Sequence, residues 1–212
     1  MRSLPLTVLM AALALGAQAT AQEDSSAAPP ADQAAQPSGI ASMQFSGFER
    51  GDGILSLSLG AVFPLGFYNP TTAAFQVANS YPGFSFALSY AGFLSDKWAL
   101  AGDLAGGFIG TINGDRLFVA PLALRAIRAF TLGSFVIAPT AGLGVSISSL
   151  GTDKKVDPLL KLGSSFLWKA SSDMSYGLNL YGNIIPQLYT TYPENNRVAF
   201  FLDATLSVAY HL

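Results

Sequence analysis

The last residues of the chain, VAFFLDATLSVAYHL (198–212), alternate between large apolar side chains and small or polar ones. In an extended chain, one side would carry Val198, Phe200, Leu202, Ala204, Leu206, Val208, Tyr210 and Leu212, and the other Ala199, Phe201, Asp203, Thr205, Ser207, Ala209 and His211. This period of two predicts a β-strand. A strand in a soluble core and a strand that faces lipid share the period, so the stretch alone leaves both open.

The composition of the whole chain favours a membrane protein. Of its 212 residues, 50% are hydrophobic and only 11% are charged, well below the roughly 25% charged residues of soluble domains. Beyond the amino terminus there is no run of about 18 or more apolar residues that could form a membrane-spanning helix. Only helices and closed β-barrels cross hydrocarbon with every backbone group hydrogen-bonded. A barrel is therefore predicted.

The amino terminus has the pattern of an export signal. Arg2 precedes the apolar run 4–15, and Ala17 and Ala19 offer small residues for cleavage, so residues 1–21 are predicted to be a cleaved signal peptide. An uncleaved anchor is the alternative. The chain has no cysteine, which excludes disulfides, thiolate metal sites and a lipid anchor on cysteine.

Residues 22–44 are rich in Ala, Pro, Ser and Gln and poor in large apolar groups. Such a segment cannot bury enough surface to offset the entropy lost on ordering. We expect a flexible periplasmic lead-in here, followed by a barrel over residues 45–212.

Eight alternating runs follow, each about as long as the 9–11 residues of a tilted membrane-spanning strand, or longer. They are residues 54–63, 84–94, 98–112, 117–128, 135–148, 158–169, 174–184 and 198–212. Their bulky apolar residues fall on one face, whereas the other face carries small residues and most of the charges. A soluble barrel would bury its bulky groups and expose its charges, so the inverted sorting predicts an all-β, transmembrane, antiparallel up-and-down barrel of eight strands. A soluble barrel or sandwich is the alternative.

The links and aromatic residues suggest an orientation. Links 95–97, 129–134 and 170–173 are short and are predicted to be periplasmic, whereas links 64–83, 113–116, 149–157 and 185–196 are predicted to be external. Aromatic rings favour the headgroup level of a membrane. Trp98, Trp168, Phe93, Phe130 and Tyr210 are expected at the periplasmic interface, and Tyr68, Tyr81, Tyr189 and Tyr192 at the outer one.

Pro121 and Pro139 fall inside predicted strands, where each removes a ladder hydrogen bond. We expect a β-bulge or an irregular register at both positions.

The ending Tyr210-His211-Leu212 resembles the carboxy-terminal signature of bacterial outer-membrane barrels, with Leu212 in place of the usual phenylalanine. Over residues 45–212 the pattern resembles the small eight-stranded barrels typified by the OmpA transmembrane domain, OmpX and OmpW. This resemblance implies a place in the outer membrane, lipid as a partner, and Tyr210 and Leu212 as an insertion signal read by the barrel assembly machinery. OmpW-like proteins are thought to pass small hydrophobic compounds, so the resemblance also implies such a solute.

The inward charges Asp103, Arg125, Lys161 and Asp203 are the candidate site inside the barrel. Asp103 and Arg125 are expected to be neighbours, and Lys161 and Asp203 to lie at comparable heights with Asn179 between them. Two interpretations are open: a plug of ion pairs, or a gate that rearranges for a solute. The many small inward residues leave a narrow cavity, unless larger residues fill it. Candidates for that are Phe93, Phe201 and Tyr181.

An enzyme is not expected. Outer-membrane lipid A deacylases and palmitoyltransferases use a histidine near the outer leaflet, whereas the one histidine here, His211, lies beside the terminus and suits a polar rim. No metal-ligand cluster, cofactor motif or basic footprint for nucleic acid appears, and a monomer is expected. Two functions remain: a narrow passive channel for small solutes, or a structural or adhesin-type barrel that displays its external loops.

Overall fold

The computed structural model describes residues 47–189 and 193–212. The predicted signal peptide and the lead-in over 22–44 lie outside the described residues, as does Tyr192. Among the described residues, no helix has both the length and the apolar character needed to cross a membrane.

Eight long antiparallel strands form a closed barrel, as the sequence predicts. They are β1 (Gly53–Asn69), β3 (Gly83–Phe93), β4 (Trp98–Gly110), β5 (Arg116–Arg128), β7 (Phe135–Leu150), β8 (Asp153–Lys169), β9 (Met174–Gln187) and β10 (Arg197–His211). Two short strands extend the sheet: β2 (Ala74–Val77) pairs with β1, and β6 (Phe130–Leu132) pairs with β7. A short 3-10 helix, η1 (Pro193–Asn195), precedes β10.

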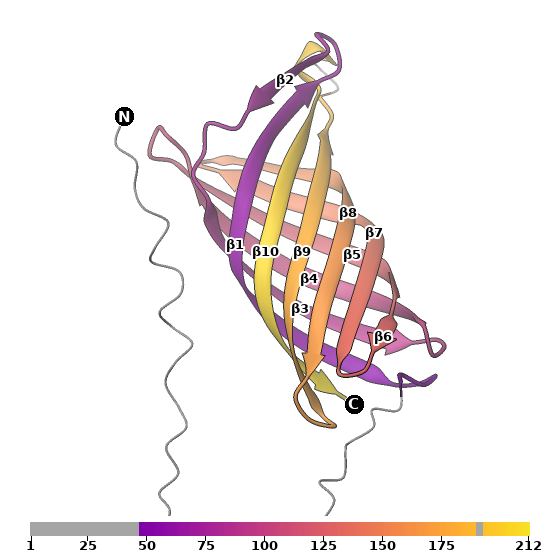
Figure 1. Ribbon diagram of the computed structural model, residues 1–212. Helices are drawn as coiled ribbons and strands as arrows, with labels where there is room; N and C mark the ends of the chain where they lie inside the picture. The colour runs from indigo at the N-terminus through magenta and orange to yellow at the C-terminus, as the bar shows by residue number, and fades with distance from the viewer. Residues whose placement is uncertain (1–46, 190–192) are drawn as a thin grey trace, which may run out of the picture. The chain divides into compact units, whose positions relative to one another are not determined.

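The first and last strands close the barrel. β10 pairs with β1 from Ile54 opposite His211 to Tyr68 opposite Val198, and Figure 1 shows the indigo β1 beside the yellow β10. The backbone of Leu212 continues the ladder, because its N–H donates to Gly53 at 2.8 Å. Closure leaves these strands without a free edge, as the predicted up-and-down barrel of eight strands requires.

The barrel has two unlike ends. We call the end with the links 94–97 and 170–173, the segment 47–52 and Leu212 the turn end, and the opposite end the loop end. At the loop end, β7 and β8 continue to a two-residue turn at Gly151-Thr152, where Gly151 has φ 59°. The predicted link 149–157 is therefore wrong. The alternation of inward and outward side chains continues through Lys155 and Asp157. It was missed because a proline such as Pro158 is typical of a strand boundary.

The prolines interrupt ladders without shifting the register. Pro121 lies opposite a gap in the β4–β5 ladder, and Pro139 lies beside the gap between β5 and β6, yet the pairing continues unchanged on both sides of each gap. The predicted bulges or irregular registers at these positions are wrong, because the missing N–H is accommodated by leaving two adjacent pairs unmade. The register shift in the β1–β10 ladder lies instead between Pro64 and Gly66.

The barrel carries its apolar bulk outside. Leu143 and Leu206 are 69% and 70% exposed, as suits side chains that face lipid. Inside, two smaller apolar clusters lie towards opposite ends. The turn-end cluster contains Phe48, Ile54, Ala91, Phe93, Ala99, Ala101, Ala129, Val136 and Ala209. The loop-end cluster contains Val62, Ile109, Val119, Ala123, Leu159, Ile185, Ala199 and Phe201.

Candidate functional site

A triad of buried charges lies inside the barrel. Arg125 on β5 donates from Nη2 to Oδ1 of Asp103 on β4 at 2.7 Å, and its Nε lies 2.6 Å from Oδ2 in an ion pair. Lys161 on β8 donates from Nζ to the same Oδ2 at 2.9 Å. All three side chains are 4% exposed or less. The structure thus brings Asp103 and Arg125 together, as predicted, and adds Lys161 to the same carboxylate.

Tyr181 on β9 joins the two cations. Its ring lies 4.9 Å from Cζ of Arg125 and 4.6 Å from Nζ of Lys161, which places a cation over the ring from each residue. Its hydroxyl accepts a hydrogen bond from Nη1 of Arg125 at 3.3 Å and shares one with Ser165 at 2.6 Å. The sequence suggested Tyr181 only as a space-filling residue. Tyr181 follows the inward-facing Asn179 by two residues, so the two side chains share a face of the strand. This spacing is the sequence feature that could have indicated a polar role for the Tyr181 hydroxyl.

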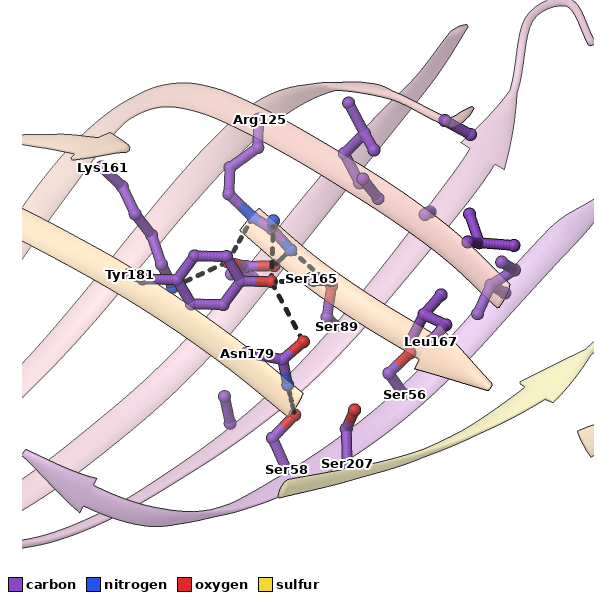
Figure 2. Close-up of a pocket in the computed structure, with 18 of the residues that line it drawn as sticks. Ser56, Ser58, Ser89, Arg125, Lys161, Ser165, Leu167, Asn179, Tyr181 and Ser207 are labelled. Atoms are coloured by element: carbon purple, nitrogen blue, oxygen red, sulfur yellow. Dashed lines mark hydrogen bonds and ion pairs between the residues drawn. The ribbon is translucent and has the colours of Figure 1, made fainter. Parts of the chain in front are cut away.

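One connected hydrogen-bond network extends from the triad to every strand of the barrel. Arg125 also donates to Ser89 on β3 and to Thr140 on β7. Tyr181 donates to Asn179, whose amide reaches Ser58 on β1 and Thr205 on β10. Figure 2 shows this chain of contacts from Arg125 through Tyr181 and Asn179 to Ser58. The network therefore ties all eight strands together across the interior.

Asp203 lies apart from the triad. Its carboxylate accepts hydrogen bonds from Asn183 at 2.7 Å and from Ser85 at 3.5 Å. Lys161 makes its close ion pair with Asp103 instead, and the residue opposite Lys161 on β9 is Asn183 rather than Asn179. Asn183, and not Asn179, therefore lies between Lys161 and Asp203, so the predicted place of Asn179 between them is wrong. Strand tilt changes which residues share a level in a barrel.

A third pair lies nearer the loop end. Lys155 Nζ lies 3.2 Å from Asp157 Oδ1, and the Asp157 side chain is buried. The sequence missed this pair because the strand was predicted to start after it. With it, the charges of Asp103, Asp157 and Asp203 balance those of Arg125, Lys155 and Lys161.

The turn end is closed by apolar and aromatic groups. Phe48, which precedes β1, stacks on Phe93 with ring centroids 4.1 Å apart. Between this pair and the triad lies a cavity of about 60 Å³ that is lined by both, with room for a few water molecules. Phe93 was expected at the membrane interface, which is wrong: it is 5% exposed and points inwards.

The aromatic residues predicted to lie at the two membrane interfaces differ from one another in exposure and in contacts. Trp98 and Trp168 are about half exposed at the turn end, with Arg128 over the Trp98 ring at 5.6 Å, and Tyr68 is 37% exposed near the loop end. Tyr189 is only partly exposed. Its ring lies 3.6 Å from Lys155 Nζ, and its hydroxyl accepts from Arg197. It therefore takes part in side-chain contacts at the loop end.

The carboxy-terminal residues face in alternating directions, as predicted. Tyr210 and Leu212 are 48% and 64% exposed on the outside. His211 shares a hydrogen bond of 2.7 Å with Ser175 and stacks on Phe48 at 5.9 Å between centroids. Over the described part of the chain, no group of three or more His, Cys, Asp or Glu residues could hold a metal ion.

Comparisons with known proteins agree with this architecture. A protein-family model matches residues 31–210. The chain belongs to that family. Among solved structures, Neisserial surface protein A (NspA) matches with a TM-score of 0.57 and 13% identity, over 76% of this chain and 96% of that one. The fold is therefore that of the small eight-stranded outer-membrane β-barrels.

Two further solved structures also match. OprG from Pseudomonas aeruginosa matches with 13% identity and a TM-score of 0.48, over 78% of this chain and 98% of that one. The attachment invasion locus protein Ail of Yersinia pestis matches with 10% identity and a TM-score of 0.47, over 77% and 99%. A search of the curated proteins finds no match.

Loss of the shared carboxylate should destabilise the barrel strongly. Asp103→Asn leaves two buried cations without their anion, and breaking a buried pair in this way costs about 3–5 kcal/mol. Lys161→Met, added to Asp103→Asn, should restore part of the loss by removing one of the two cations. The free energy of unfolding in denaturant, measured with the protein in lipid vesicles, tests both.

The exposed pair at the turn end provides the control. Asp96 and Lys97 lie 3.7 Å apart with side chains more than 60% exposed, so Asp96→Asn should change the stability by less than about 1 kcal/mol. Equal effects of Asp103→Asn and Asp96→Asn would contradict the assigned role of the triad.

Proposed function

We propose that this chain is a bacterial outer-membrane protein whose barrel is closed to solutes and acts as a rigid support for the segments at its loop end. The observation that carries the proposal is the filled interior. The buried triad lies between two apolar clusters, and two interior cavities, of about 60 and 10 Å³, have no lining residue in common. Moving an ion past the triad would require separating charges that have little water to replace their partners.

The loop end supports the display role. β1 continues to Asn69 and pairs there with β2, which forms a hairpin. Arg197 lies over the Phe67 ring at 4.9 Å and donates to Gln187 and Tyr189. Beside them is a mainly polar hollow of about 310 Å³. These contacts hold the hairpin near β9 and β10, and a preorganised surface of this kind loses less entropy when it binds a partner.

A narrow conduit is the second candidate. It is favoured by the 60 Å³ cavity, whose walls include small residues such as Ser58, Ala87 and Ser207. For a small, uncharged solute to pass, both the triad and the Phe48–Phe93 pair would have to move. The sequence-based hypothesis of a gate would then apply to Asp103 and Arg125.

A measurement of single-channel conductance distinguishes the closed barrel from the narrow conduit. Refolded wild-type protein in a planar bilayer should give no regular single-channel steps, because the closed interior offers no continuous water path. If it gives steps, and if Arg125→Asp changes their size whereas Asp96→Arg at the exposed turn does not, the conduit is the better description and the closed barrel is rejected.

The orientation can be tested with single cysteines, because the natural chain has none. Thr71→Cys lies in the exposed loop before β2 and Asp96→Cys in the turn between β3 and β4. A membrane-impermeant maleimide added to intact cells should label Thr71→Cys and not Asp96→Cys, and should label both after lysis. The reverse pattern would contradict display of the loop end.

We also propose that the assembly machinery recognises Tyr210 and Leu212. Replacing both with Ser should lower the fraction of protein that migrates as a folded, heat-modifiable species in cells. The matched control is Leu206→Ser with Val208→Ser, which removes exposed apolar groups from the same outer face of β10. If the control pair lowers the folded fraction equally, the loss reflects lipid-facing area and not a terminal signal.

A further inference from the structure

Phe48 is buried although it precedes the first strand. Its side chain is 3% exposed. Backbone hydrogen bonds hold the following residues against the end of β3: Gly51 N–H donates to Phe93 O at 3.0 Å, and Phe93 N–H donates to Asp52 O at 2.8 Å. Glu49 N–H donates to the Asp52 carboxylate at 2.8 Å. The segment 47–52 therefore turns back and directs one aromatic ring into the barrel.

The surroundings of this ring are those of an aromatic binding site. Phe93 stacks on it at 4.1 Å with 15° between the ring planes, and the His211 ring is nearly parallel at 5.9 Å. Lys169 Nζ lies 4.8 Å from its centroid. Ring stacking and a cation over the ring face are interactions that select aromatic groups over other apolar ones. These three contacts come from β3, β10 and β8, and not from the segment that carries Phe48.

The site continues into the interior. The cavity of about 60 Å³ has Phe48 in its wall, with Ile54, Ile127, Val136 and Leu167 among its apolar lining residues and the triad on its polar side. Figure 2 shows Leu167 in the same lining as the polar residues around Tyr181. Withdrawal of the Phe48 side chain would join its volume to this cavity. The enlarged space would have an apolar mouth and a polar inner wall.

We propose that the turn end of the barrel is a binding site for one small, uncharged aromatic ring, and that Phe48 is its tethered occupant. A free aromatic compound of similar size can take the same place when Phe48 is absent or displaced. Because its own backbone holds Phe48 beside the site, its effective concentration there is high, so in the natural protein a free ring competes poorly. This inference goes beyond the proposed display function and does not depend on it.

The test is binding of fluorobenzene to Phe48→Ala in lipid nanodiscs, followed by ¹⁹F NMR. Folding of the variant is first checked by its heat-modifiable migration. Phe48→Ala should bind fluorobenzene at least tenfold more tightly than wild type does, because the tethered competitor is gone. With methyl-labelled protein, the bound probe should show nuclear Overhauser effects to Ile54, Ile127 and Leu167.

Two variants control for partition into lipid. Phe84→Ala removes a ring that is 52% exposed on the outer face, so it should bind the probe no better than wild type. Phe48→Leu fills part of the site with an apolar side chain that cannot stack, so its affinity for the probe should lie between those of wild type and Phe48→Ala. If Phe48→Ala does not fold, Phe48→Val retains an apolar anchor but leaves space, and should bind more tightly than wild type.

The outcomes separate clearly. Equal affinity in the Phe48 and Phe84 variants, or Overhauser effects only to outer residues such as Leu57 and Leu104, would overturn the site. A rise in the unfolding temperature of Phe48→Ala with fluorobenzene, absent in Phe84→Ala, would support it, since a ligand stabilises the state that binds it.

Discussion

The shared use of the Asp103 carboxylate by Arg125 and Lys161 is the interaction on which the interior depends. A buried pair of charges is often no better than well-packed apolar groups, but removing one member leaves the others uncompensated. Here the consequence is wider, because Arg125 is also hydrogen-bonded to Ser89, Thr140 and Tyr181, and Tyr181 leads on to Asn179. The hydrogen bonds of this interior network, the polar layer of the barrel, can all form only when the eight strands hold their register. It thereby selects one arrangement among the many that lipid-facing apolar residues alone would accept.

The lipid-facing exterior and the polar interior place opposite demands on the same strands. On the outside, any bulky apolar side chain can face lipid. The outward positions therefore carry Leu, Phe, Val or Tyr without a common motif. Inside, each position has a particular neighbour, because the space between eight strands is small. The two apolar clusters shield the polar layer from both ends, and shielding strengthens its electrostatic contacts. The same shielded contacts that stabilise the barrel would also oppose the passage of a solute, as the proposed closed barrel requires.

The sequence predicted the fold because alternation and face sorting are properties of single strands. The eight strands, their antiparallel order and the pairing of the last with the first all followed from them. Contacts between strands were harder to predict. Asp103 and Arg125 lie on adjacent strands and were paired correctly. The ion pair of Lys161 with Asp103 was missed, because strand tilt, which the alternation does not reveal, changes the relative heights of residues on distant strands. Asp157 was missed because Pro158 suggested a boundary, and Phe48 because it lies before the first predicted strand, which begins at residue 54.

The position of Phe48 also bears on the closure of the barrel. Its ring contacts Phe93 on β3, Lys169 on β8 and His211 on β10, so one residue near the start of the barrel meets one at its very end. The full set of contacts cannot exist until the last strand has reached the first. These contacts of Phe48 are therefore complete only in the closed barrel, so this one side chain connects the start of the barrel with its last strand.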